Sequence, residues 1–201
     1  MATTFQEVDT ACNNSQSCFV ANSDIQSWAA TESSLAGLPV SLVLAQWIAE
    51  NAWYTGTVAA ECNNPGNVYY GNHSASGCGS YDCSHECSLD TTFASVGTGQ
   101  YGAEMIAGVL NNQYCQVKAA YQQSELTSGG QQLYDFAVNN GFTILSNGTY
   151  NAAYALGDSN WDGNGHYESS NWNGAPASSV PGSALIYFIN NDGLSGYDYV
   201  S

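Results

Sequence analysis

The chain has 201 residues, of which 17 are Asp or Glu and only one, Lys118, is basic, so its formal net charge is −16. Binding to nucleic-acid phosphates or to anionic membranes depends on clustered Lys and Arg, so this composition excludes both kinds of partner. Hydrophobic residues make up 44% of the chain and aromatic residues 12%, which excludes general disorder and favours one compact globule.

Residues 1–34 are predicted to form an N-terminal extension that packs on the core. Ile25, Trp28, Ala29 and Glu32 recur at helical spacing and indicate a helix there. The first twenty residues lack the basic and apolar regions of a secretory signal, so export would need a signal that has been removed or another route.

The most apolar run covers residues 38–50 and predicts a central, buried helix with Pro39 in its first turn. Glu50 is the only acid between residues 35 and 50, and it shares a helix face with Gln46 and Trp47. Partial desolvation beside an aromatic ring, without a nearby cation, is expected to raise the pKa of Glu50. A general acid for glycosidic cleavage needs this property, whereas a solvated acid at a helix end is the alternative.

Residues 56–100 are rich in Gly, Asn, Ser, Cys and Tyr and predict a loop and hairpin lobe tied by cysteines. The seven cysteines of the chain predict up to three disulfides and one remaining thiol in a secreted protein. A zinc site that includes Cys83, His85 and Cys87 is the alternative.

Helical periodicity returns after this lobe and persists through most of the second half of the chain. Gly141 is placed to end one helix in the left-handed conformation, and Gly157 to end the next. The run at 184–189 predicts either a strand or a short helix. The predicted helical segments cover residues 101–121, in one continuous periodicity, then 131–140 and 149–156.

Asp158, Asn160 and Asp162 form the first half of a calcium-loop pattern, D-x-N-x-D-G, with oxygen ligands at alternate positions. The twelfth position is Ser169 rather than Glu, so half of the pattern is present. This segment predicts a structural calcium ion, with an ordinary Asp/Asn/Gly turn as the alternative. No other cofactor is expected.

Two consecutive segments carry a family resemblance. PVSLVLAQWIAENAW at 39–53 and AAECNNPGNVYYG at 59–71 resemble the glucosaminidase family of bacterial autolysins and flagellar muramidases. That family shows P-S-x-x-L-A-Q-x-x-x-E-S-x-W followed by A-x-x-x-N-N-x-F-G. Weaker matches continue in order, so the resemblance covers residues 35–156.

The resemblance implies a mainly α (α+β) fold, with a lysozyme-like helical core and a small cysteine-tied β-hairpin lobe. It implies cleavage of the β-1,4 bond after N-acetylglucosamine in peptidoglycan, with Glu50 as the general acid. A second acid comes from the hairpin lobe, where Glu86 is preferred over Asp82 and Asp90. The family's final Tyr lines the cleft, and Tyr150 matches it.

Substrate contacts are expected from residues of the same region. Sugars stack on aromatic faces, whereas packing in the core is the alternative for each aromatic side chain. The predicted substrate-binding residues are Trp53, Asn64, Tyr69, Tyr70 and Tyr81.

The sequence therefore predicts a secreted peptidoglycan hydrolase whose catalytic domain spans residues 35–156, with a Gly/Asn/Ser-rich extension at 157–201 in the same globule. A lytic transglycosylase on the same substrate is one alternative. A non-catalytic glycan-binding, surface or virion module is another. Because the chain has no basic patch with which to approach an anionic wall, it would rely on uncharged sugar contacts, on bound cations or on an acidic medium that neutralises its carboxylates. The last of these alternatives predicts an acid-shifted optimum.

Overall fold

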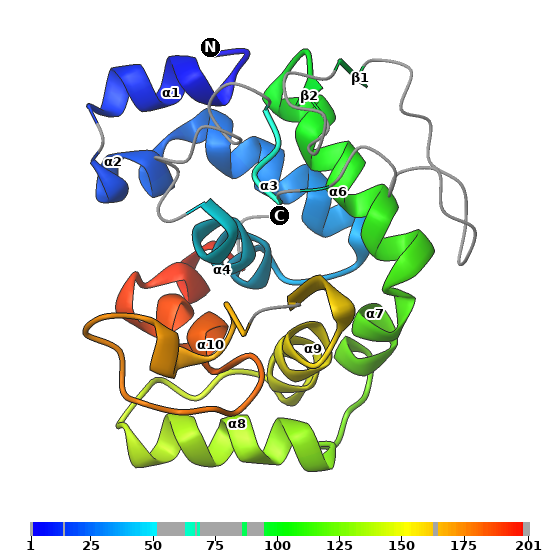
Figure 1. Ribbon diagram of the computed structural model, residues 1–201, viewed down its shortest axis with the longest axis vertical. Coiled ribbons are helices and arrows are strands. Elements are labelled where there is room, and N and C mark those ends of the chain that lie inside the picture. Colours follow the sequence, from blue (N-terminus) through cyan, green and yellow to red (C-terminus); the bar gives the residue numbers. More distant parts are fainter. Residues whose placement is uncertain are drawn as a thin grey trace. The chain divides into compact units, whose positions relative to one another are not determined.

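The computed structural model describes residues 2–13, 15–51, 63–66, 68, 86–87, 95–162 and 165–198. This part of the chain is mainly helical, which confirms the coarse prediction of fold class (Figure 1). The α-helices are α1 (Phe5–Cys12), α2 (Gln16–Ala21), α3 (Ser23–Ala36), α4 (Val40–Asn51), α6 (Gly99–Gln113), α7 (Cys115–Tyr121), α8 (Ser128–Asn139), α9 (Asn147–Gly157) and α10 (Ser183–Asn191). The short 3-10 helices are η2 (Asn160–Asp162), η3 (Ser169–Asn171) and η4 (Leu194–Tyr197).

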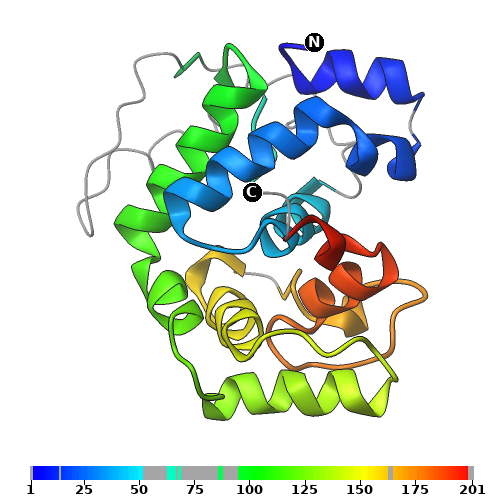
Figure 2. The same ribbon diagram turned by 180° about the vertical axis from the view of Figure 1, so that it is seen from behind.

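The helices belong to two compact units. The first unit comprises Met1–Gly37 and Gln46–Gln113, and the second comprises Leu38–Ala45 and Tyr114–Ser201. Helix α4 therefore gives its first half to the second unit and its last half to the first. In the first unit α3 and α6 lie side by side, and in the second α9 packs on both α7 and α8 (Figures 1 and 2).

The core of the first unit begins with the N-terminal residues. Phe5 is buried, and its ring lies 5.0 Å from that of Trp28 and 5.4 Å from that of Trp47. Thr4 and Glu7 form a capping box that satisfies backbone N–H groups at the start of α1. The predicted helix at residues 25–32 is confirmed as α3, whereas α1 and α2 were not predicted.

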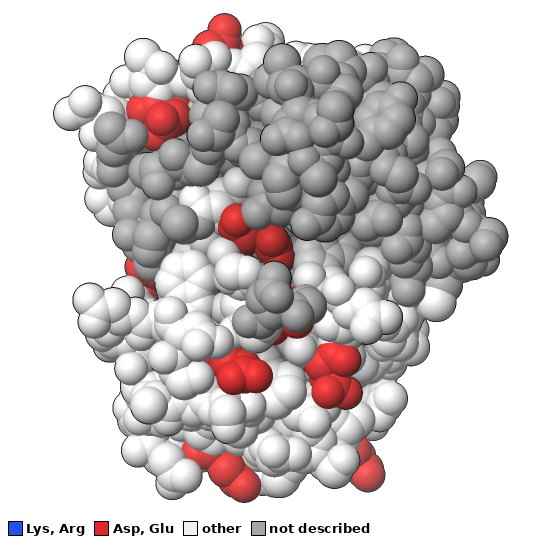
Figure 3. Space-filling view, in the orientation of Figure 1, with Lys and Arg blue, Asp and Glu red and all other residues white. Residues whose placement is uncertain are grey.

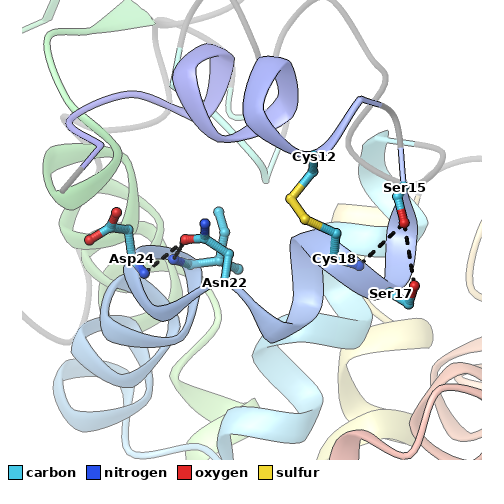
Figure 4. Close-up of a disulfide and its surroundings, with 7 residues drawn as sticks. Cys12, Ser15, Ser17, Cys18, Asn22 and Asp24 are labelled. Carbon is cyan, nitrogen blue, oxygen red and sulfur yellow. Dashed lines mark hydrogen bonds between the residues drawn. A yellow bond between two sulfur atoms is a disulfide. The ribbon is translucent and has the colours of Figure 1, made fainter.

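A disulfide between Cys12 and Cys18 joins the end of α1 to α2 (Figure 4). Ser15 begins α2 by accepting a hydrogen bond from the Cys18 N–H at 3.4 Å. Asn22 begins α3 in the same way, by accepting from the Asp24 N–H at 2.9 Å. The disulfide confirms that cysteines are cross-linked in this chain, and Cys115 is also disulfide-bonded.

Replacing both Cys12 and Cys18 by Ala is expected to lower the free energy of unfolding by about 2 kcal/mol, because the open loop gains entropy in the unfolded chain. Urea unfolding at constant pH measures this difference. Ser17→Ala, an exposed change between the two cysteines, is the matched control and should cost less than about 0.5 kcal/mol. Equal stability of the cysteine variant and the wild type would contradict the prediction.

Helix α4 confirms the prediction of a buried helix at residues 38–50. Pro39 lies just before its first residue, and the Pro39 carbonyl accepts hydrogen bonds from the N–H groups of Leu42 and Val43 at 3.1 and 3.2 Å. Nearly every side chain along the helix is buried. Ser41, near its start, donates to the Asp198 carboxylate twice, from its N–H at 2.7 Å and from its hydroxyl at 2.8 Å. The Asp198 carboxylate, one residue after η4, thus accepts the hydrogen bonds of two donors near the start of the most apolar helix.

The later helices confirm the predicted periodicity. Residues 101–121 form two helices, α6 and α7, and 184–189 is helical rather than extended, as part of α10. Gly141 has φ 67° after the end of α8, so it takes the predicted left-handed conformation. The Phe142 N–H donates to the Ala137 carbonyl at 2.9 Å and closes this helix end.

Two short strands are described within the predicted hairpin lobe. Strands β1 (Glu86–Cys87) and β2 (Ser95–Val96) pair in antiparallel fashion, with Glu86 opposite Val96. Residues 63–66, 68 and 97–100 of the predicted lobe are described as well, the rest lies outside the described part of the chain, and the lobe stays a prediction.

Candidate functional site

Glu50 lies in the last turn of α4 and is half-buried. Trp47, one turn earlier, is fully buried. The next residue, Asn51, is buried as well, and its amide donates to the Trp47 carbonyl at 3.4 Å and to the Pro65 carbonyl. The end of α4, directly after Glu50, is thereby hydrogen-bonded to the turn at residues 63–66.

The buried side chains of Asn63 and Asn64 hold that turn in place through hydrogen bonds. The Asn64 side chain is fully buried, accepts from the Val68 N–H at 3.0 Å and donates to the Val68 carbonyl at 2.9 Å. The Asn63 side chain accepts from the Phe5 N–H at 2.9 Å. A Cβ on Gly102 would lie 1.9 Å from the Asn63 carbonyl oxygen, so α6 approaches this turn where only glycine fits. These contacts give Asn64 a structural role, and its predicted contact with substrate stays a prediction.

Glu32 of α3 is a buried acid whose importance the sequence did not reveal. Its side chain is 0% exposed, and its Oε2 accepts a hydrogen bond from the indole N–H of Trp47 at 2.8 Å. Its other oxygen has no hydrogen-bond partner within the described ranges. Burial raises the pKa of Glu32 well above its usual value, and the bond from Trp47 offsets this only in part. Its signal in the sequence was an acid on the apolar face of α3.

A continuous set of contacts runs from this buried acid to the end of α4. Glu32 orients the Trp47 indole, the Trp47 carbonyl accepts from Asn51, and Asn51 directly follows Glu50. All four residues belong to the first unit. The chain's single basic residue, Lys118, belongs to the second. The carboxyl groups of the first unit therefore have no Lys or Arg of their own unit with which to pair.

Tyr150 of α9 belongs to the second unit and is fully buried. Its hydroxyl accepts from the Leu145 N–H at 3.2 Å, and its ring packs edge-on against Tyr134 at 5.8 Å. Burial raises the pKa of the Tyr150 hydroxyl. These contacts account for the residue as part of the core, and its predicted place in a cleft stays a prediction.

The side chains of the remaining predicted cleft residues lie outside the described part of the chain. The backbone of Glu86 lies in β1, and nothing is described of its side chain. The other predicted acids, sugar-binding aromatics and zinc ligands lie outside the described residues. They are Trp53, Tyr69, Tyr70, Tyr81, Asp82, Cys83, His85 and Asp90.

The predicted calcium loop contains a carboxylate that accepts hydrogen bonds from the backbone. Asp162 is nearly buried, and its carboxylate accepts hydrogen bonds from the N–H groups of His166, at 2.5 Å, and Tyr167, at 2.9 Å. Burial raises the pKa of Asp162, while the backbone hydrogen bonds lower it. Asp158 ends α9 and Asn160 begins η2. Within the described ranges no three His, Cys, Asp or Glu residues are grouped for a metal ion, and the calcium site stays a prediction.

Calcium is expected to raise the melting temperature if the loop at 158–169 binds it as predicted. At ten times a dissociation constant of about 1 mM, the gain in stability is about 1.4 kcal/mol, or roughly 3–5 °C. Thermal unfolding with and without 10 mM calcium measures it, with magnesium as the control ion. Asp158→Asn should reduce the shift. An unchanged melting temperature at this concentration would contradict the predicted site.

The surface carries the acidity expected from composition. Acidic side chains stand on the described surface in Figure 3, and no Lys or Arg is visible on that face. None of the described helices is both long and apolar enough to span a membrane. An anionic ligand would therefore meet repulsion rather than a basic patch.

Searches with family models, among curated proteins and among solved structures found no match to this chain. The resemblance to glucosaminidases thus depends on the residues of α4 and the segment that follows it.

Proposed function

We propose that the chain is a secreted peptidoglycan hydrolase of the glucosaminidase type, which cleaves the β-1,4 bond after N-acetylglucosamine. The observation that supports this proposal is the environment of Glu50. It is a half-buried carboxyl at the end of an apolar helix, beside a buried Trp47 and next to an anchored Asn51. The disulfides favour an oxidising, extracellular location.

In the proposed reaction, Glu50 donates its proton to the glycosidic oxygen as the bond to the leaving sugar breaks. Either a second carboxylate, for which we propose Glu86, activates a water molecule on the opposite face, or the 2-acetamido group of the substrate attacks first. The water then supplies the hydroxyl of the new reducing end, and its proton returns to a carboxylate. The separation between the two carboxyl groups would decide between retention and inversion.

Digestion of purified peptidoglycan by the whole chain tests the proposal. After borohydride reduction, mass spectrometry of the products should show N-acetylglucosamine at the newly formed reducing ends. Anhydro-sugar ends would instead identify a lytic transglycosylase. Intact glycan strands after incubation with the folded protein would contradict both activities and favour a binding or structural module.

A further inference from the structure

The second unit contains a pocket whose lining includes none of the residues predicted for catalysis, although the lining residue Leu145 donates to the Tyr150 hydroxyl. Its volume is about 480 Å³, within the range of about 300–1,000 Å³ that small-molecule sites occupy. The turn at residues 143–146, between α8 and α9, forms one wall, and η4 forms another. The residues that decide its chemistry are Pro39, Tyr121, Ile144, Ser146, Ser195 and Asp198.

The polar side of the pocket is built around Asp198. Ser41 holds this carboxylate in place with two hydrogen bonds, of 2.7 and 2.8 Å, one to each oxygen. Each carboxylate oxygen can accept a second bond, so Asp198 retains capacity for a donor from a ligand. Tyr121 lines the same pocket, and the pKa of its hydroxyl is raised, first by burial and then by the Asp198 charge.

Apolar side chains also line the pocket, and one of them is exposed to solvent. Ile144 is 52% exposed, one of the few large hydrophobic side chains that the described surface leaves uncovered. Pro39 and Leu145 are further apolar residues of the lining. The lining contains no Lys or Arg, so nothing there would compensate an anionic ligand against the Asp198 charge. The pocket therefore suits an uncharged molecule with one apolar face and several hydroxyl or amide donors.

We propose that this pocket binds one uncharged N-acetylated sugar unit of a glycan strand, as a second binding site whose lining does not include Glu50. A sugar ring has an apolar C–H face for Ile144 and Pro39, and its hydroxyl and amide groups can donate to Asp198 and pair with Tyr121 and Ser195. The choice of a glycan rests on the proposed function. Binding itself needs neither Glu50 nor cleavage.

Gly196 is a position at which a large side chain can be introduced to fill the pocket without disturbing the fold. It lines the pocket, it does not have a positive φ, and a Cβ there would meet nothing within 4 Å. Gly196→Trp should therefore occupy the cavity. Val138→Trp is the matched control, because Val138 is 49% exposed on α8 of the same unit and does not line the pocket.

The experiment is an NMR titration of the ¹⁵N-labelled full chain, carrying Glu50→Gln, with the uncharged trimer of N-acetylglucosamine. Saturable shifts are expected at the amides of Ile144, Leu145 and Ser195, with a dissociation constant on the order of 1 mM. Gly196→Trp should weaken this binding at least about tenfold and Val138→Trp should leave it unchanged, while both keep a dispersed spectrum. Ile144→Ala, which removes only part of the apolar wall, should weaken it less.

The outcomes separate this proposal from the hydrolase proposal. Absence of shifts at these amides, or shifts that persist in Gly196→Trp, would overturn the pocket even if the wild type cleaves peptidoglycan. Binding of the deacetylated, cationic trimer in preference to the acetylated one would overturn it as well. Saturable binding at these amides would support it even if the wild type cleaves nothing.

Discussion

Glu50→Gln is expected to reduce cleavage of peptidoglycan by about 10²–10⁴-fold, the range typical for loss of a general acid. Glutamine keeps the size of the side chain, but it has no acidic proton to give to the leaving oxygen. Release of reducing sugars from purified walls under conditions of excess substrate measures the loss. The substitution should leave the melting temperature nearly unchanged, since Glu50 is only half-buried.

Glu104→Gln provides the matched control for this experiment. Glu104 is a half-buried acid on α6 of the same unit, where it accepts a hydrogen bond from Gln100 at 3.0 Å. Its replacement should keep activity within about twofold of the wild type. Equal activity of the wild type and a folded Glu50→Gln variant would remove Glu50 from the mechanism.

Glu32→Gln is expected to make the protein more stable at neutral pH and to flatten the dependence of its stability on pH. Burial raises the pKa of Glu32 in the folded state, so the folded protein holds the proton more tightly than the unfolded chain. The favourable contribution of Glu32 to the free energy of unfolding is complete below the pKa that this residue has in the unfolded chain. It disappears as the pH rises through the higher pKa of the folded state. Glutamine cannot ionise and escapes this loss, while it can still accept from the Trp47 indole.

Urea unfolding at several values between pH 3 and pH 8 measures this effect. Glu32→Leu distinguishes charge from hydrogen bonding, because it leaves the buried Trp47 N–H without its acceptor and should cost about 1–3 kcal/mol at acid pH. Asp162 also has a raised pKa, so the Glu32→Gln variant should keep a smaller dependence of the same sign. Parallel pH profiles for the wild type and Glu32→Gln would contradict the prediction.

The sequence was sufficient to predict the helices whose own pattern of apolar residues indicates that they are buried. Helix α4 could be predicted because it is apolar almost all round, and the end of α8 because Gly141 supplies the left-handed residue. Helices α1 and α2 are short, with 8 and 6 residues, and depend on caps, on the Cys12–Cys18 disulfide and on Phe5 reaching distant aromatic rings. Short helices have little periodicity to recognise.

The candidate site was predictable in part for the same reason. The place of Glu50 follows from the helix that carries it, since its position depends on neighbours within two turns. The buried state of Glu32 depends on Trp47, which lies 15 residues further along the chain. The two hydrogen bonds of the Asn64 side-chain amide depend on the position of the Val68 backbone, which forms the other half of both bonds. Such contacts between elements cannot be obtained from the periodicity of a single segment.

The bond between Ser41 and Asp198 has a consequence for the time at which this protein can fold. The two residues are 157 positions apart, so the start of α4 lacks its carboxylate partner until the ribosome has synthesised almost all of the described chain. Contacts of such long sequence separation form slowly, because a large loop must close first. Because the second unit joins Leu38–Ala45 to Tyr114–Ser201, its packing can be completed only after nearly all of the described chain has been synthesised.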